Sequence, residues 1–278
     1  MAYTTIDDPS AYFQTAIWSG TGSALSVTFD GNSDMQPDMV WVKNRTTSSD
    51  HRLSDSVRGT SSHLVPNDAA AIDTSSTALT AFNSDGFSVG TEQSYSQSGK
   101  NHVGWAWKAG TSFTNDASGT GIGTIDSAGS VSTDAGFSIT KFTADGNNLT
   151  AAHGLGVAPT MIITKNLSIS KQWSVYHSSL GAGKAIFLNV TDVADTDNTY
   201  WNNTAPTSTT LSYGTWSGNN NGNEIIAYCF AEKKGYSKFG SYTGNGNADG
   251  TFVYTGQKSA FIMIKASSRA GTWNMYDV

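Results

Sequence analysis

The sequence of 278 residues is poor in charge, in cysteine and in long apolar runs, and each shortage excludes a class of protein. Charged residues make up 14% of the chain and the net charge is −6, with no basic cluster of the kind that follows a nucleic-acid backbone. The single cysteine, Cys229, excludes an intrachain disulfide framework. No stretch reaches the roughly 20 apolar residues that a membrane span requires. We therefore expect neither a nucleic-acid partner nor membrane insertion.

The residues that are abundant favour an all-β protein. The best helix formers are scarce, whereas the 29 glycines and many serines, threonines, asparagines and aspartates supply turns. Eight tryptophans and eleven tyrosines contribute to an aromatic content of 11%, which suits half-buried strands. The composition thus predicts sheets joined by polar turns.

An internal repeat organises the chain, and its anchor is an apolar run that ends in lysine. The three copies of the anchor are Met39–Lys43, Met161–Lys165 and Phe261–Lys265. The residues that stand eight positions after these lysines are His51, Trp173 and Trp273. Each copy therefore predicts a β-hairpin whose loop is polar.

Further matches extend the repeat and divide the chain. An aromatic residue precedes a glycine turn at Trp18, Phe142 and Tyr242, and the predicted strand Val103–Trp107 matches Ile226–Phe230. The predicted division is an N-terminal arm (1–15), a first repeat (16–110), a polar linker (111–136), a second repeat (137–232) and the start of a third repeat (233–278). Within the linker we expect one edge strand around Gly129–Thr133. A half-repeat cannot bury its own apolar face. We expect the third repeat to complete a sheet of the second repeat or of another subunit, or the chain to be a segment of a longer parent.

The strand pattern favours β-sandwiches over a solenoid. Trp105 and Trp107 fall on one face of a predicted strand, as do Tyr228 and Phe230 in the second copy. A repeat of about 90–100 residues is typical of a Greek-key or jelly-roll sandwich, whereas solenoid repeats have about 20–45 residues. We predict an all-β chain of tandem antiparallel β-sandwich repeats, jelly-roll or lectin-like.

Several long strings resemble a family of proteins found in marine tailed phages and prophages. The strings are Tyr3–Thr15, His153–Pro159, Trp201–Thr207, Ala227–Glu232 and Gly235–Gly246. Members of that family are described as proteins of unknown function, or as tail, fibre or lectin-like virion proteins. The resemblance implies a virion location, after assembly in the host cytoplasm, and a lectin-like sandwich. It brings no catalytic residues.

The first 15 residues suit a peptide that adds a strand to a neighbouring virion protein, because they carry a proline and aromatic residues but no core pattern. The predicted anchoring residues are Tyr3, Ile6, Pro9, Tyr12 and Phe13. The predicted partners are other virion structural proteins and further copies of the chain, with a trimer favoured for a fibre.

Aromatic residues beside polar loops suggest an alternative function, in which the protein is a lectin-like module that binds host surface glycans. The candidate glycan-binding residues are Trp201, Asn202, Trp216 and Asn219. Core packing is the competing interpretation, since most aromatic residues in such strands are buried.

Two other groups of residues invite a chemical interpretation. Asp192, Asp195 and Asp197 are weak candidates for a calcium loop, because Ca²⁺ takes several oxygen ligands from a flexible segment. The loop lacks the glycine and the distal glutamate of a helix–loop–helix site, so we predict no bound metal and no cofactor. The lysine that ends each anchor recurs in every copy, which favours a structural role at a sheet rim or beside a carboxylate over ligand binding.

Catalytic constellations are lacking in the sequence. There is no Gly-x-Ser-x-Gly elbow, and the glutamates are few. His177 shares its place in the repeat with Asp55 and Asp277, and aspartate cannot replace imidazole as a base near neutral pH. We expect a non-enzymatic structural component of a tailed-phage virion: a tail fibre, tail appendage or capsid-associated protein that contributes to host attachment. A further alternative is a polysaccharide-degrading enzyme, which would need a cleft with two carboxylates about 5–10 Å apart.

Overall fold

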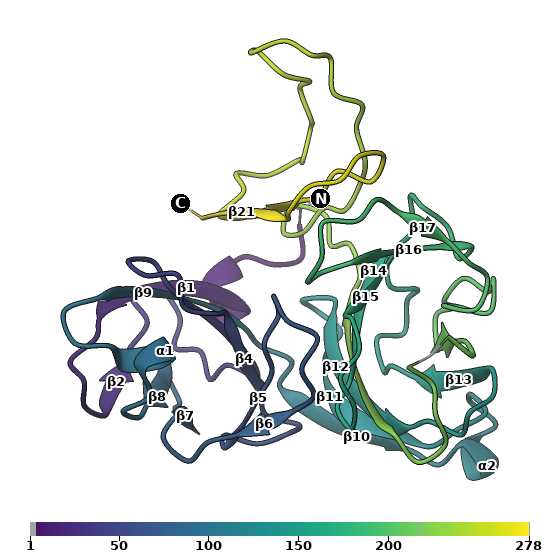
Figure 1. The fold of residues 1–278 in the computed structure, drawn as a ribbon, viewed down its shortest axis with the longest axis horizontal. Coiled ribbons are helices and arrows are strands. Elements are labelled where there is room, and N and C mark those ends of the chain that lie inside the picture. The colour runs from purple at the N-terminus through teal and green to yellow at the C-terminus, as the bar shows by residue number, and fades with distance from the viewer. Residues whose placement is uncertain (1–3, 217, 278) are drawn as a thin grey trace.

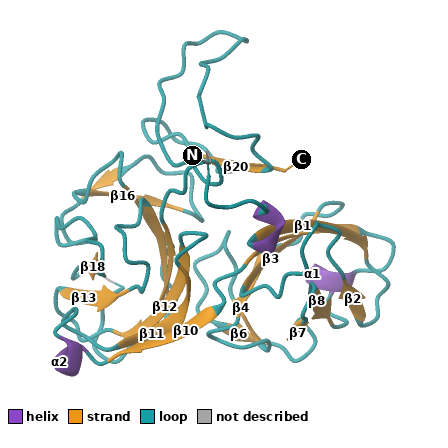
Figure 2. Cartoon of the chain, turned by 180° about the vertical axis from the view of Figure 1, so that it is seen from behind, coloured by secondary structure: helices purple, strands orange, loops and turns teal. Residues whose placement is uncertain are grey.

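The computed structural model describes residues 4–216 and 218–277, and strands and loops make up nearly all of them. The helices within these residues are single turns: η1 (Pro9–Ala11), α1 (Gln93–Ser96) and α2 (Ala117–Thr120). Figure 2 shows how small they are beside the strands. None of the described helices has the length and apolarity needed to cross a bilayer. The predicted all-β class is confirmed, and the paired strands of the sheets are antiparallel.

The first repeat forms two sheets that enclose a core. The larger sheet has the order β1-β9-β3-β4, with β1 (Phe13–Ser19), β9 (Asn101–Trp107), β3 (Met39–Asn44) and β4 (Arg52–Asp55). The smaller sheet has the order β2-β8-β7, with β2 (Leu25–Val27), β8 (Phe87–Val89) and β7 (Leu79–Phe82). Trp18 and Val40 from the larger sheet are buried in one cluster with Phe87 from the smaller one. A short hairpin follows β4, formed by β5 (Ser62–His63) and β6 (Asp73–Thr74).

The second repeat is built around an eight-stranded sheet with the order β10-β11-β12-β19-β14-β15-β16-β17. Its strands are β10 (Thr111–Asn115), β11 (Ser127–Ser132), β12 (Phe137–Thr143), β19 (Glu224–Phe230), β14 (Met161–Asn166), β15 (Ser174–His177), β16 (Lys184–Phe187) and β17 (Asp195–Thr196). A two-stranded sheet of β13 (Leu149–Ala152) and β18 (Thr210–Tyr213) shares a core with it, where Leu149 and Leu211 meet Ile162 and Ile225.

Residues 111–136 are not the linker that their small, polar side chains predicted. β10 pairs with β11 along its whole length, and β11 pairs with β12, so this segment supplies two strands of the second sheet. Between them the Asp116 carboxylate accepts hydrogen bonds from the backbone N–H groups of Ser118 and Gly119 and caps α2. The one edge strand expected around Gly129–Thr133 overlaps β11, which lies inside the sheet, whereas β10 was not expected because its residues other than Phe113 are polar.

The residues predicted as an anchoring arm belong to the first repeat wherever the structure describes them. Ile6 is buried, and Phe13 opens β1 and packs on Trp107 with 4.9 Å between ring centroids. Pro9 starts η1, and Tyr12 lies edge-on to Tyr236 of the third repeat. Tyr3 lies outside the described residues. The prediction of an extended anchoring arm is therefore wrong for Ile6, Tyr12 and Phe13, whose side chains pack within their own chain, whereas that of Pro9 is exposed.

The predicted hairpin is present in all three copies of the repeat. Met39 lies opposite Asp55 on β4 and Trp107 on β9. Met161 lies opposite His177 on β15 and Phe230 on β19 in the same way. In the third repeat β20 (Phe261–Ile264) pairs with β21 (Asn274–Asp277), and Phe261 lies opposite Asp277. Among the described strands β20 has no second partner, whereas β3 and β14 each have one on both sides.

The three hairpins turn equivalent faces toward one central core. Met39 and Trp41 of the first repeat and their equivalents Met161 and Ile163 of the second are buried in a single cluster. The third hairpin packs against this cluster through Phe261 and Met263, its residues at the same places. Figure 1 shows this hairpin lying above the junction of the first two repeats, with the long loop that precedes it projecting away.

Candidate functional site: the junctions between repeats and the open third repeat

Two of the four candidate glycan-binding residues are part of the core. Trp201 is 2% exposed, donates its indole N–H to the carbonyl oxygen of Lys184 and packs on Tyr176. Asn219 is buried, and its amide donates to the carbonyl oxygens of Asn147 and Gly214. Their assignment as glycan ligands was therefore wrong. Asn202 is exposed at a turn, where its φ of 50° places the backbone in the left-handed region.

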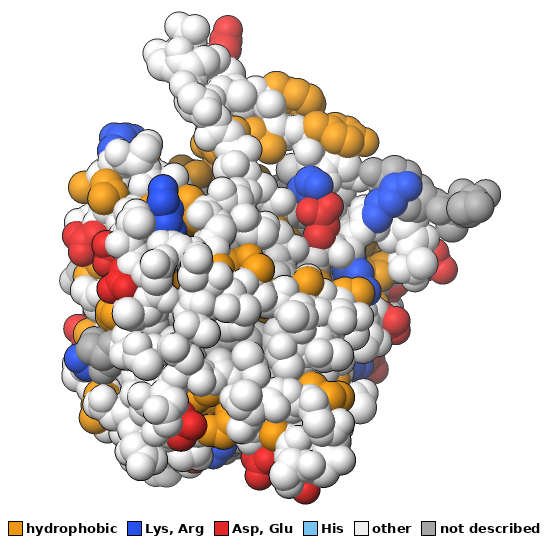
Figure 3. All heavy atoms as spheres, turned by 90° about the vertical axis from the view of Figure 1, so that its right-hand side faces the viewer, with side chains coloured by type: hydrophobic (Ala, Val, Ile, Leu, Met, Phe, Trp, Pro, Cys, Tyr) orange, Lys and Arg blue, Asp and Glu red, His pale blue; other side chains and the backbone are white. Residues whose placement is uncertain are grey.

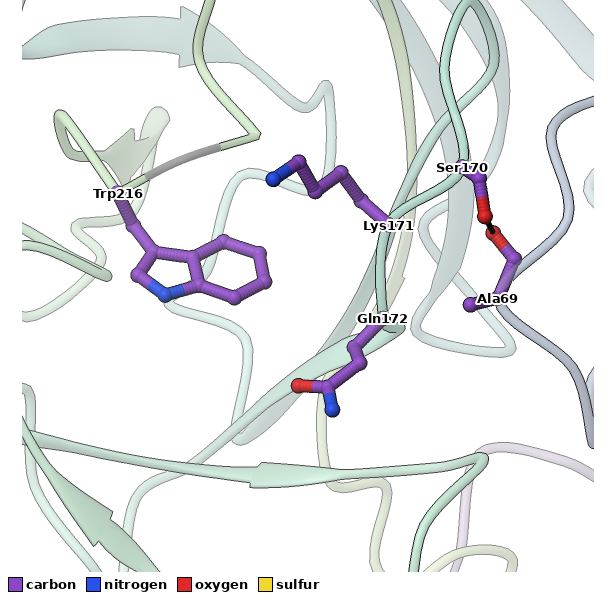
Figure 4. A pocket seen from close by; sticks show the side chains of 5 residues that line it. All are labelled: Ala69, Ser170, Lys171, Gln172 and Trp216. Atoms are coloured by element: carbon purple, nitrogen blue, oxygen red, sulfur yellow. Dashed lines mark hydrogen bonds between the residues drawn. The ribbon is translucent and has the colours of Figure 1, made fainter.

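Trp216 is the candidate that remains beside a surface cavity. Its half-buried ring packs on Tyr200 with 4.9 Å between centroids. The indole faces an open cavity of about 270 Å³ whose other lining residues are Ala69, Ser170, Lys171 and Gln172. Figure 4 shows the side chains of Lys171 and Gln172 pointing toward the same opening as the indole. An aromatic face with an ammonium and an amide nearby can stack on a sugar ring and donate hydrogen bonds to its hydroxyls.

The three aspartates considered for calcium do not form a ligand cluster. Asp197 accepts hydrogen bonds from the backbone N–H and the hydroxyl of Thr199, and these bonds lower the pKa of its carboxyl group. Asp195 accepts a hydrogen bond of 2.7 Å from the hydroxyl of Tyr200. Asp192 is exposed. Within the described residues, no three histidine, cysteine, aspartate or glutamate side chains gather as metal ligands would.

The repeated lysines bind backbone carbonyl groups. Lys43 donates to the carbonyl oxygen of Ser49, and Lys165 donates to that of Lys171, at the equivalent place six residues ahead. Lys265 donates to the carbonyl oxygen of Gly271 in the same way. The predicted structural role is thus consistent with the contacts, although the partners are carbonyl groups and not carboxylates.

Lys165 and Lys265 also reach the preceding repeat. Lys165 is 1% exposed and donates to the carbonyl oxygen of Ala69 at 3.0 Å, while Lys265 donates to that of Val190 at 2.9 Å. Burial lowers the pKa of Lys165 to about 8, although the Asp68 carboxylate acts in the opposite direction. Ala69 and Val190 lie in matching segments of their repeats. We call these segments connector loops (residues 64–72 and 186–194), and the lysine-bearing loops they contact receiving loops (residues 43–51, 165–173 and 265–273).

Both junctions between successive repeats use the same hydrogen bonds. The Trp173 indole N–H donates to the carbonyl oxygen of Val65 at 3.0 Å, and the Trp273 indole N–H donates to that of Phe187 at 2.8 Å. The connector loops and receiving loops also exchange backbone bonds at matching places. These pairs, donor first, are Lys171 to Ala69, Gly271 to Thr191, Ile72 to Leu167 and Ala194 to Ser267, with lengths of 2.8–3.1 Å. A repeated interface of this kind is heterologous, since one surface of each repeat contacts a different surface of the next.

The first junction contains a buried polar group that the sequence did not reveal. The Arg58 guanidinium and the Asp55 carboxylate form an ion pair of 2.6 Å that is almost wholly buried. The Tyr228 hydroxyl of the second repeat donates to the same Asp55 oxygen at 2.6 Å. Burial raises the pKa of Tyr228 well above its ordinary value, so the phenol stays protonated and keeps this bond. Asp55 and Tyr228 are 173 positions apart, and no local pattern links them.

The third repeat exposes apolar positions that are covered in the second. Ile262 and Tyr276 lie opposite each other on the hairpin and are 40% and 58% exposed, whereas the equivalent Ile162 and Tyr176 are buried. The loop before the hairpin exposes Phe252 and Tyr254 to 86% and 72%. Figure 3 shows apolar side chains on the upper projecting part of the molecule. We call these four residues the open apolar surface. Large exposed apolar patches mark binding sites.

Comparison with known proteins gives one match. A family model described as "Domain of unknown function (DUF7483)" matches residues 8–278. No curated protein and no solved structure gives a significant match.

Proposed function

This chain belongs to the DUF7483 family of domains of unknown function, and we propose that it is a non-enzymatic structural component of a tailed-phage virion. The proposed location is a tail fibre, a tail appendage or the capsid surface. We further propose that its repeats are tandem β-sandwiches of jelly-roll or lectin-like form. The long strings that resemble marine phage proteins, such as Tyr3–Thr15 and Gly235–Gly246, support the virion setting.

The open apolar surface is the observation that carries the structural role. Ile262 and Tyr276 are exposed where the second repeat buries Ile162 and Tyr176, and Phe252 and Tyr254 of the preceding loop are exposed as well. Contact with another subunit would remove them from water, and such burial is the main favourable term in most protein association. We propose that further copies of the chain cover this surface in a symmetric oligomer, with a trimer favoured, and that other virion proteins are its neighbours.

The oligomer is tested by sedimentation of the full chain and of the double variant Phe252→Ser, Tyr254→Ser. We expect the native chain to sediment as an oligomer and the variant as a monomer. Ile17→Ser is the matched control, because Ile17 is 60% exposed on β1 and lies outside the open apolar surface. A native chain that is monomeric at high micromolar concentration, or a variant that assembles as well as the native chain, contradicts the proposal.

The virion location is tested on particles. Mass spectrometry of purified tailed phage or induced prophage particles that encode the protein should recover it in stoichiometric amounts. Antibody labelling in the electron microscope should then place it on the tail or the capsid. Its absence from purified particles contradicts the location without bearing on the oligomer.

The surface around Trp216 favours a second function, the binding of host glycans. Trp216, Lys171 and Gln172 offer a stacking face and hydrogen-bond donors around one cavity. On a panel of bacterial surface glycans, Trp216→Ala and Gln172→Ala should each reduce binding of the native chain's ligands. Val157→Ser, an exposed apolar substitution elsewhere, should leave it unchanged. A chain that binds no glycan on the panel contradicts this function.

A further inference from the structure

The cavity beside Trp216 offers a positive charge that the folded chain does not neutralise. Among the described lining residues Lys171 is the only charged one, although the whole chain has a net charge of −6. Within the described part of the chain its ammonium group forms no ion pair and no hydrogen bond, and neither does the side-chain amide of Gln172. Both side chains point toward the opening (Figure 4). The cavity therefore presents free hydrogen-bond donors and one free cation to a ligand.

The backbone that holds these donors is fixed by the first junction. The backbone N–H of Lys171 donates to the carbonyl oxygen of Ala69 at 2.9 Å, and the Ser170 hydroxyl donates to the same oxygen at 3.0 Å. The carbonyl oxygen of Lys171 accepts a hydrogen bond of 2.8 Å from the Lys165 ammonium. The carboxylate that acts on Lys165, that of Asp68, is not among the lining groups. A site held in this way loses little conformational freedom when a ligand binds.

The Trp216 indole is held in place from behind. Its ring packs on Tyr200 and Phe187, with 4.9 and 6.0 Å between centroids, and its backbone N–H donates to the carbonyl oxygen of Thr199 at 2.9 Å. The ring is half-buried, so part of its surface stays open toward the cavity. A rigid aromatic surface of this kind takes the apolar face of a sugar ring.

The architecture of the repeat does not require these side chains, because the first repeat has others at the same places. Glu92 occupies the place of Trp216, since the backbone N–H groups of both donate to equivalent carbonyl oxygens, at 3.0 and 2.9 Å. Ser49 and Asp50 stand six and seven positions after Lys43, as the lysine and the glutamine of the cavity stand after their own anchor lysine. The aromatic residue and the free cation thus come together in the second repeat, whereas the first repeat has two carboxylates there.

We infer that the cavity takes one carboxylate-bearing sugar ring, a uronic acid residue of an acidic polysaccharide, with its apolar face on the Trp216 indole and its carboxylate on the Lys171 ammonium. The Gln172 amide would donate to a ring hydroxyl. The cavity of about 270 Å³ is a little smaller than the usual range of about 300–1,000 Å³, which suits one ring of a chain whose neighbours stay outside. The inference rests on the proposed glycan-binding function and names the kind of glycan.

The test compares matched charged and neutral ligands. Short oligosaccharides of galacturonate, glucuronate and mannuronate are titrated into the full chain in a calorimeter, each beside its methyl ester, which has the same rings without the charge. We expect at least one acid to bind about tenfold more tightly than its ester, as a charged hydrogen bond implies. Added salt should weaken the acid more than the ester, because it screens the ion pair. Equal binding of acids and esters, or no binding of any acid at millimolar concentration, overturns the inference.

Variants assign the preference to single groups. Lys171→Met keeps the alkyl stem and the backbone bonds but removes the charge, so it should weaken binding of the acid about tenfold and leave binding of the ester as it was. Trp216→Ala should weaken both, because it removes the surface that they share. Lys108→Met is the matched control, since Lys108 does not line the cavity, and it should bind like the native chain. Equal binding of the acid by Lys171→Met and the native chain contradicts the inference.

The kind of glycan and the glycan-binding function fail on different results. A neutral glycan whose binding depends on Trp216 but not on Lys171, with no acid bound, would overturn the inference and leave the function standing. A chain that binds neither the acids nor any glycan of the wider panel contradicts both.

Discussion

Lys165 is one of the largest fully buried side chains, yet its ammonium group is held by two carbonyl oxygens, and none of the described residues places a carboxylate in contact with it. A buried charge is tolerated only when its hydrogen-bonding groups are satisfied, and here the first repeat supplies part of that shell. The stability of the junction between the first and second repeats therefore depends on whether Lys165 is protonated.

The lowered pKa of Lys165 gives the junction a pH dependence whose sign can be stated. In the unfolded chain the lysine keeps its proton up to about pH 10.5, whereas in the folded chain it releases it near pH 8. Between these values the unfolded state binds more protons, so the free energy of unfolding rises with pH. Denaturant titrations from pH 8 to 10.5 should show this rise in the native chain relative to Lys165→Met. A difference between the two chains that stays constant, or falls, over this range contradicts the assignment.

A second prediction at the scale of single residues concerns the Tyr228 hydroxyl. Tyr228→Phe removes the donor to Asp55 and leaves a buried carboxylate with less support, which should cost about 1–3 kcal/mol of unfolding free energy. Tyr176→Phe is a suitable control, because Tyr176 is also buried but its hydroxyl makes no hydrogen bond to the described residues. The control should change the free energy by less than about 0.5 kcal/mol. Equal effects of the two substitutions would contradict a role for the Asp55 bond.

At the scale of elements, the sequence revealed the strands whose side chains are large and missed those held mainly by backbone pairing. The three hairpins were predictable, because Met39–Lys43 and its equivalents place apolar residues in an unbroken run before a polar loop. β10 was not, since its residues other than Phe113 are serine, threonine and asparagine, and β11, with small residues around Val131, was expected only in its second half. The N-terminal residues were misjudged for a different reason. The partner of Phe13 is the strand β9, which is distant in the sequence, so no local pattern shows that Phe13 belongs to a sheet.

β11 offers a prediction about its close pairing with β12. A Cβ added at Gly129 would overlap the carbonyl oxygen of Ile139, so Gly129→Ala must push the two strands apart. The expected loss is about 1–3 kcal/mol, the range for overpacking. Gly240→Ala is the control, because nothing surrounds that position and its φ is not in the left-handed region. Amide exchange should speed up along β10 and β11 in the first variant only. Unchanged amide exchange along β10 and β11 in Gly129→Ala would contradict this prediction.

At the scale of the whole molecule, the junctions could not have been predicted from the repeat alone. The sequence suggested that the recurring lysines lie at a sheet rim or beside a carboxylate, and it marked the tryptophans that follow them, but each pattern describes a single hairpin. That Trp173 donates to Val65, and that equivalent hairpin faces share one core, depends on how the repeats are placed relative to one another. Two of the four glycan candidates failed in the same way: Trp201 packs on Tyr176 and donates to the carbonyl oxygen of Lys184 within the second core, and no local pattern reveals these contacts.

A shared core predicts that the repeats unfold together. Trp173 is fully buried among residues of both repeats, including Leu64 and Trp105 of the first. Trp173→Ala should therefore cost about 3–5 kcal/mol, the range for truncating a buried aromatic side chain. It should speed amide exchange equally in the small sheet β2-β8-β7 and in the pair β13–β18, although neither contains Trp173. Calorimetry should show a single unfolding transition for the native chain and a single one for Trp173→Ala. Two separate transitions, or faster exchange confined to the second repeat, would mean that each repeat folds independently and that the central core only joins repeats that are already folded.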